Sequence, residues 1–385
     1  MERIILLLGC LVSPPGNFVA RNRACMNRLL PYLLPGLVFQ SVIIGGGYAT
    51  GRELVEFFLA RGPLPGLLGL LVAGLVFAAV MATAYEFARQ TGAHDYRTFC
   101  RRLLGPAWVL YEVAYIMLVV LILAVVGSAA GELASDALGV PPAAGTVGMM
   151  LLVGTLAFFG SALIGKVLAG WSVLLYAVYL LVFALTLAAH GDAIALSLRE
   201  PPAAERNWAV SGVRYAAYNL SLPAVLFCMT LLKTRREAVG AGIMTGLIAI
   251  VPALLFYAAM LAYYPAIVTQ PVPALFLMAQ LDLPWVQALF QLVVFGTFVE
   301  TGAGVLHAIN ERIDVHARER GHALPRWGRP AVAGGLLLLS VYGATTFGIV
   351  DLIARGYGAL SWVFIAVLIV PLMTLGLWRV LRESC

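Results

Sequence analysis

The ionisable residue with most scope for chemistry is a glutamate inside a long apolar segment. Glu300 lies near the middle of residues 285–310, between Thr297 and Thr301. A carboxylate at the centre of a membrane span is costly and is a functional hypothesis by default. Because burial disfavours its charged form, Glu300 could bind a proton near neutral pH. The alternative is a structural carboxylate paired with a neighbour such as Arg214.

Three consecutive glycines, residues 45–47, interrupt the first apolar segment, 29–60. Each glycine costs a helix about 1 kcal/mol relative to alanine. The tetrapeptide TGRE at 50–53 matches the capping-box pattern. We therefore predict that the helix stops at the glycines and restarts at Thr50, with Glu53 engaged in the cap. The alternative is that the glycines only let another helix pack closely.

A second interruption is predicted in segment 208–233, which reads RYAAYNLSLPAVLF around Pro223. Proline breaks the helical ladder but suits the first turn of a restarting helix. An ordinary proline kink is the alternative. The two breaks fall in the first helix of each half, which points to an inverted-repeat transporter with a mid-membrane binding site. The N–H groups that open a restarting helix suit a carboxylate, and the carbonyls that end the preceding one suit a cation.

The segments that must hold these residues are long and apolar. The chain has 385 residues, 62% hydrophobic and 11% charged, whereas soluble domains carry about 25% charged residues. We predict an all-α integral membrane protein with one domain, 26–385, after an uncertain N-terminal segment, 1–25, in which translation could begin at Met26. Its ten transmembrane helices, each long enough to cross about 30 Å of hydrocarbon, are expected at 29–60, 65–90, 107–131, 143–164, 166–190, 208–233, 238–264, 285–310, 330–350 and 356–379.

The lysines and arginines predict the orientation of these helices. With the amino terminus in the cytoplasm, the inside segments hold eighteen of them and the outside loops only four, namely Arg61, Arg199, Arg206 and Arg355. Positive residues gather in cytoplasmic loops. We therefore expect a multi-pass protein of the bacterial inner membrane with both termini cytoplasmic. The net charge of +6 is explained by these loops and not by binding to nucleic acid.

Several function classes lack support in the sequence. The chain has no GxSxG, HExxH or Walker pattern, and its five cysteines have no CxxC spacing. We therefore expect no catalytic residues, no metal site and no cofactor other than Na⁺ or H⁺ as a coupling ion. The expected partners are a small-molecule substrate and the lipid bilayer, and the oligomeric state is left open.

Two motifs carry a resemblance to a known family. The run GGGYATGRELVEFF resembles the first helix of the YkvI-like bacterial membrane proteins, and YNLSLPAVLF resembles their sixth. That family is similar to the amino acid–polyamine–organocation superfamily, whose LeuT-type fold has two inverted five-helix repeats. The resemblance spans about residues 28–380 and implies repeats at about 29–190 and 208–379, with helices 1 and 6 broken.

The resemblance also implies roles for particular residues. Helices 1 and 6 would supply the substrate-binding groups, and sodium-coupled relatives hold a cation between helix 1 carbonyls and helix 8 hydroxyls. Glu300 is not required by such a hydroxyl site, so the coupling ion stays open between sodium and the proton. The implied substrate-binding residues are Gly45, Gly46, Gly47, Thr50, Asn219, Leu220 and Ser221, and the implied coupling residues are Thr297, Thr301 and Glu300.

The function expected from these features is secondary active transport. We predict a proton- or sodium-coupled symporter for a small amino-acid-like or organic solute, working by alternating access around the two breaks. One alternative is an intramembrane ligand sensor that uses the same pocket without net transport. The other is a channel, which would show ohmic, non-saturating flux.

Overall fold

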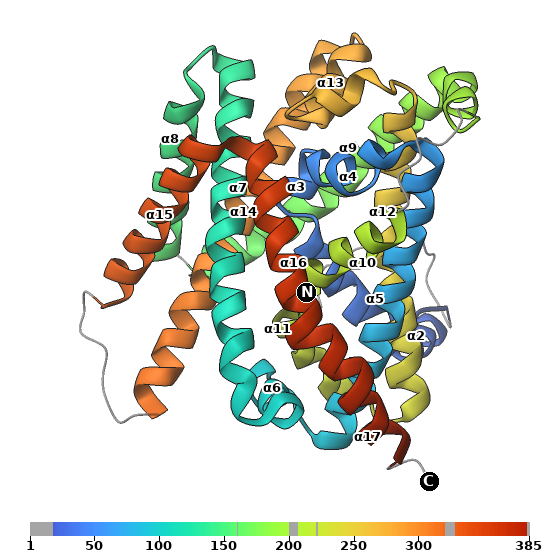
Figure 1. Cartoon of the computed structure of the whole chain (residues 1–385), viewed down its shortest axis with the longest axis vertical. Helices are drawn as coiled ribbons and strands as arrows, with labels where there is room; N and C mark the ends of the chain where they lie inside the picture. The colour runs from blue at the N-terminus through green and yellow to red at the C-terminus, as the bar shows by residue number, and fades with distance from the viewer. Residues whose placement is uncertain (1–17, 160, 200–206, 221, 320–327, 383–385) are drawn as a thin grey trace.

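The computed structural model describes residues 18–382, except 160, 200–206, 221 and 320–327. All regular elements in this part of the chain are helices, as the composition predicts. The long helices α5, α7 and α12 run along the long axis of the molecule, and the short helices α6 and α13 lie at its opposite ends (Figure 1). The all-helical fold class is therefore confirmed.

The first half of the chain folds into eight described helices. Glycines mark several of their ends, because a left-handed residue stops the ladder of hydrogen bonds. Gly92 and Gly139, for example, follow α5 and α7 with φ of 62° and 67°. The bounds are α2 Phe18–Ile43, α3 Gly46–Ala49, α4 Arg52–Phe57, α5 Pro63–Thr91, α6 Tyr96–Leu104, α7 Trp108–Leu138, α8 Pro142–Phe159 and α9 Ser161–Ser197, with a 3₁₀ turn η1 Leu59–Arg61.

The second half follows a similar order of long and short helices. Its longest helix, α14, ends well beyond the expected residue 310. The bounds are α10 Trp208–Asn219, α11 Leu222–Val225, α12 Arg235–Leu261, α13 Pro273–Gln280, α14 Pro284–Glu319, α15 Gly328–Asp351, α16 Gly358–Phe364 and α17 Leu377–Arg382. The 3₁₀ turns are η3 Leu226–Leu231 and η4 Ala266–Thr269, and the π-helical turns are η5 Leu352–Tyr357, η6 Ile365–Ile369 and η7 Leu372–Gly376.

Six stretches among the described residues are long and apolar enough to cross a membrane. The last of them, of 53 residues, turns at Gly348, whose φ is 68°. Two shorter apolar helices, 29–43 and 142–156, fall below the length of a full span. The six stretches are Pro63–Thr91, Tyr96–Leu138, Leu174–Ser197, Arg235–Leu261, Pro284–His307 and Pro330–Arg382. The chain is a multi-pass membrane protein.

Small residues let helices from the two halves of the chain approach closely. A Cβ added at Gly242 or Gly246 of α12 would collide with the backbone of Ala82 or Ala78 of α5. On the other side of α5, a Cβ at Gly212 of α10 would collide with the carbonyl of Gly69. Close backbone approach of this kind is how helices pack where no hydrophobic effect drives them together. Helix α5 is thereby held between α10 and α12, next to the segment that contains the glycine triplet.

The short helices α6 and α13 were not expected from the sequence. Helix α6 begins where the Asp95 side chain accepts a hydrogen bond from the Thr98 amide, at 2.8 Å, which is an N-cap. Helix α13 begins at Pro273, and the Ala274 amide donates to the Thr50 carbonyl at 2.9 Å. Both segments are too short to span a membrane, so hydropathy alone indicated loops.

Candidate functional site

The helical ladder at the glycine triplet is interrupted twice. Helix α2 ends at Ile43, one turn of helix α3 runs from Gly46 to Ala49, and α4 begins at Arg52. Gly51 between them has φ of 78°, a left-handed conformation that glycine adopts at little cost. At such a break a backbone carbonyl can accept a hydrogen bond from a neighbouring side chain. The Tyr179 hydroxyl donates to the Ala49 carbonyl at 2.8 Å.

The predicted capping box at 50–53 is wrong. The Thr50 hydroxyl donates to the Gly47 carbonyl at 2.7 Å and accepts from the Arg52 amide at 3.3 Å, so its described hydrogen bonds do not include the Glu53 amide that a capping box requires. The same pattern forms a complete box at 234–237, where Thr234 has the extended conformation that a cap requires. The left-handed Gly51 redirects the chain between Thr50 and Glu53, so the Glu53 side chain is free of the cap and points elsewhere.

Glu53 reaches the other interrupted segment instead. Its carboxylate accepts a hydrogen bond from the Tyr218 hydroxyl at 2.7 Å, one residue before the end of α10 at Asn219. Only 4% of Glu53 is exposed. A Cβ at Gly47 would collide with this carboxylate, so the glycine leaves the space that Glu53 occupies. This contact was not predicted from the sequence, because the cap pattern already accounted for Glu53.

The second segment is interrupted at residues 219–222. Helix α10 ends at Asn219, whose side-chain amide donates to the Tyr215 carbonyl at 3.0 Å. Leu220 is buried with a non-helical ψ of 71°, and α11 restarts at Leu222. Pro223 lies in the first turn of α11, the position that tolerates proline. Ser221, a predicted substrate-binding residue, lies outside the described residues.

Tyrosine rings surround the Glu53 carboxylate. The Tyr218 ring stacks on that of Tyr357, with centroids 4.6 Å apart, and Tyr215 meets it edge-on at 5.8 Å. Tyr48 of α3 and Tyr215 are both 1% exposed, and within the described residues their hydroxyls have no hydrogen-bond partner. Buried hydroxyls are normally satisfied. These two hydroxyls, one from each interrupted segment, are therefore candidates to bind a small ligand beside Glu53.

Helix α14 brings the predicted coupling residues to the other end of the glycine triplet. A Cβ at Gly45 would lie 3.4 Å from the Thr301 methyl group and 3.7 Å from its hydroxyl. Thr297 is buried one turn earlier, and its hydroxyl donates to the Val293 carbonyl at 3.0 Å. Glu300 is half-buried and interacts electrostatically with Tyr176 of α9. The triplet thus lies between the Thr301 hydroxyl of α14 at Gly45 and the Glu53 carboxylate at Gly47.

Two neighbouring charged residues have structural contacts of their own. Arg52 pairs with Glu56 at 3.0 Å and also donates to the carbonyls of Val268 and Gln270. Arg214, the suggested partner of Glu300, donates instead to the Gly358 carbonyl at 2.9 Å. Arg52 therefore ties α4 to the segment before α13, and Arg214 ties α10 to α16.

Comparison with known proteins identifies a relative of this chain. No family model matches the chain. It is 27% identical over 291 residues to YkvI, an uncharacterized membrane protein of Bacillus subtilis (strain 168), covering 72% of this chain and 79% of YkvI. The predicted resemblance to YkvI is thereby confirmed.

Solved transporter structures resemble the fold. MhsT, solved with L-phenylalanine, matches with a TM-score of 0.57 and 14% identity over 89% of this chain and 87% of its own. A Na⁺-coupled sialic acid symporter matches with a TM-score of 0.60 and 12% identity, over 87% and 78%. The chain has the LeuT-type fold. A manganese transporter of Eremococcus coleocola gives a TM-score of 0.55 and 15% identity, over 94% and 80%. At such identities the likeness concerns the fold of this LeuT-type chain and not its solute.

Proposed function

We propose that this LeuT-type chain is a secondary active transporter, a symporter of a small amino-acid-like solute driven by Na⁺ or H⁺. The observation that carries the proposal is the meeting of two interrupted segments, 43–52 and 219–222, at the buried carboxylate of Glu53. Interrupted backbone at membrane depth is tolerated where it is buried in protein or lines a cavity. The solved neighbours that share the fold include symporters, which supports the same class of function.

In the proposed topology the chain crosses the membrane ten times, in two inverted five-helix repeats. We assign α2–α4 to the first crossing and α10, α11 and η3 to the sixth, so that the repeats run over about 29–190 and 208–379. The excess of lysine and arginine on one side of these crossings supports cytoplasmic termini in the bacterial inner membrane.

The solute is proposed to lie between the two interruptions. The backbone of Gly45, Gly46 and Gly47 with Thr50 would receive its carboxylate, and Asn219, Leu220 and Ser221 would face it. Glu53 would receive a positively charged amino group, because a buried carboxylate is costly unless a cation pairs with it. The tyrosine rings around Glu53 favour a cation as well.

Uptake into proteoliposomes tests the proposed function. A thermal-shift screen of amino acids, organic acids and amines, with and without sodium, first identifies a solute. We expect the purified protein to concentrate that labelled solute against its gradient when a sodium or proton gradient is imposed. Saturable binding without accumulation would indicate the sensor, and non-saturating flux would indicate the channel. Either result would contradict the proposal.

We assign the coupling of solute transport to an ion gradient to the face of α14 that lies against Gly45. If Glu300 carries the coupling proton, Glu300→Gln should still exchange solute across the membrane but fail to accumulate it, and exchange should lose its dependence on pH. If the ion is sodium, Glu300→Gln and Thr301→Val should weaken sodium activation by comparable amounts, about tenfold for the loss of one ion ligand. Counterflow and pH-jump uptake in sodium-free liposomes distinguish the two. A Glu300→Gln protein that accumulates solute like the wild type under both gradients would make Glu300 structural.

The orientation is testable by labelling single cysteines in a background without native cysteines. Thr269, before α13, and Arg236, in the first turn of α12, both have exposed side chains. We expect Thr269→Cys to react with an impermeant maleimide added to intact cells and Arg236→Cys to react only after the membrane is opened. The opposite pattern would place the termini outside the cytoplasm.

A further inference from the structure

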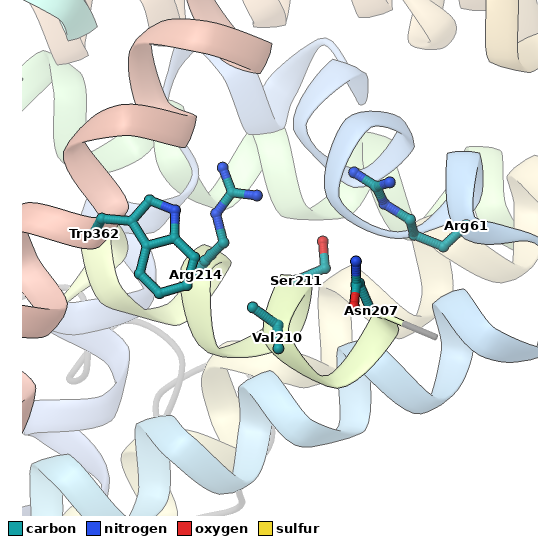
Figure 2. Close-up of a pocket in the computed structure, with 6 residues that line it drawn as sticks. All are labelled: Arg61, Asn207, Val210, Ser211, Arg214 and Trp362. Atoms are coloured by element: carbon teal, nitrogen blue, oxygen red, sulfur yellow. The ribbon is translucent and has the colours of Figure 1, made fainter. Parts of the chain in front are cut away.

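A cavity lies apart from Glu53, between α10, α16 and the turn that follows α4. Its volume is about 370 Å³. Figure 2 shows Arg214 and Arg61 at the two ends of a row of shorter side chains, with both guanidinium groups on the same side of α10. The lining residues are Arg61, Asn207, Val210, Ser211, Arg214 and Trp362.

The guanidinium of Arg214 is held in position by its surroundings. Its Nη2 donates to the Gly358 carbonyl at 2.9 Å and its Nε to the Ser361 hydroxyl at 3.2 Å. It also lies 5.6 Å from the ring of Trp362 and 5.9 Å from that of Phe57. Of its five N–H groups, these two are the ones bonded to described residues. A guanidinium fixed in this way loses little side-chain entropy when it binds a further acceptor.

The amino end of α10 adds to the positive potential of the cavity. This helix has twelve residues, and the Asn207 side chain before it does not cap it. The side-chain amide of Asn207 instead lines the cavity (Figure 2). The first N–H groups of a helix carry partial positive charge. Among the described residues, the carboxylate that acts on Arg214 is that of Glu56, and Glu56 is already paired with Arg52 at 3.0 Å. Arg214 therefore keeps much of its attraction for an anion.

The Phe57 ring connects this cavity with the central site. It lies against Arg214 on one side and packs on Tyr218, the hydrogen-bond partner of Glu53, with ring centroids 5.4 Å apart. Ser211, which lines the cavity, donates to the Phe57 carbonyl. Phe57 is only 3% exposed. The Phe57 ring thus separates the arginine-lined cavity from the buried Glu53 carboxylate. The cavity is expected to attract an anion and the carboxylate a cation.

We propose that this cavity binds a small organic carboxylate. The carboxylate is received by Arg214, with Arg61 and the Asn207 amide opposite, and its hydrocarbon part lies along Trp362 and Val210. A cavity of this size falls within the range of sites for small molecules, and arginine suits a planar carboxylate because its N–H groups match both oxygens. The proposal holds whether or not the chain transports a solute.

Equilibrium binding of benzoate to the purified full-length protein in detergent tests the proposal, and no transport is required. Benzoate combines a planar carboxylate with a ring that fits beside Trp362, and titration calorimetry measures its affinity. We expect wild-type protein to bind benzoate and to bind benzylamine, the cation of similar shape, at least tenfold more weakly. Arg214→Gln should weaken benzoate binding at least tenfold.

The matched control is Arg355→Gln, since Arg355 is 82% exposed and pairs with Asp351 away from the cavity. This variant should bind benzoate like the wild type. If Arg214→Gln does not yield a folded protein, Arg61→Gln on the opposite wall should show the same loss. Benzoate binding that survives both substitutions, an equal loss in Arg355→Gln, or equal affinity for benzylamine would each overturn the proposal. Failure of uptake in liposomes would leave this result unaffected, so the two proposals fail separately.

Discussion

Replacing Glu53 by glutamine is expected to weaken binding of an amino-bearing solute at least about thirtyfold. The substitution keeps the shape of the side chain and leaves an oxygen for the Tyr218 hydroxyl, which bonds to the carboxylate at 2.7 Å. It removes the negative charge that would face the solute's amino group. Losing one partner of a buried, hydrogen-bonded charge pair costs about 2–5 kcal/mol. Titration calorimetry with the solute found by the thermal-shift screen measures the change.

Glu56→Gln is the matched control, because it makes the same chemical change on the same helix. Glu56 is paired with Arg52 at 3.0 Å, and Arg52 has two backbone carbonyls as further partners. We expect this variant to bind the solute within about threefold of wild type, as for a partly exposed ion pair. A Glu53→Gln protein with wild-type affinity would exclude Glu53 from the solute site. Retained binding and exchange with loss of accumulation would instead assign the coupling charge to Glu53.

Gly47→Ala is expected to reduce solute binding at least tenfold while leaving a folded protein. The added Cβ would collide with the Glu53 carboxylate and lie 2.8 Å from its Cγ and Cδ atoms. Glu53 must then move away from Tyr218, because α3 and α4 are both fixed by their neighbours. Overpacking of a core typically costs about 1–3 kcal/mol, so a lower melting temperature should accompany the loss. Thermal unfolding and calorimetry on the same preparation measure both effects.

The control for the glycine substitution is Gly304→Ala on α14. A Cβ at Gly304 meets no heavy atom within 4 Å, and alanine favours a helix over glycine by about 1 kcal/mol. This variant should keep its affinity and unfold at the same or a higher temperature. If Gly47→Ala binds solute as tightly as Gly304→Ala does, then Gly47 serves helix packing only.

The central site and the outer cavity are expected to attract opposite charges. The cavity presents Arg61 and Arg214, whereas the centre presents Glu53 among tyrosine rings. The proposals are tested by different probes, since benzoate has no amino group.

The sequence predicts those features that depend on neighbours along the chain. Apolar length and the scarcity of charge predict an all-helical membrane protein, and the glycine triplet and Pro223 mark segments where the helical ladder is interrupted. These features arise from backbone conformation and from the cost of placing polar groups in hydrocarbon. Both effects depend on residues that are close together in the sequence. The same reasoning missed α6 and α13, because helices of nine and eight residues are too short to be recognised as spans from hydropathy.

The partner of Glu53 depends on tertiary structure. Residues 50–53 and 234–237 match the same cap pattern, yet only the second forms the box, because Gly51 adopts a left-handed conformation in its packed surroundings. The Tyr218 that binds Glu53 is 165 residues away along the chain. The cavity likewise joins Arg61 to Arg214 and Trp362 from three separate helical segments. Residue types and spacing therefore indicate which side chains are available for chemistry, whereas helix packing decides which of them meet, because contacts between distant segments depend on the shapes of all the helices between them.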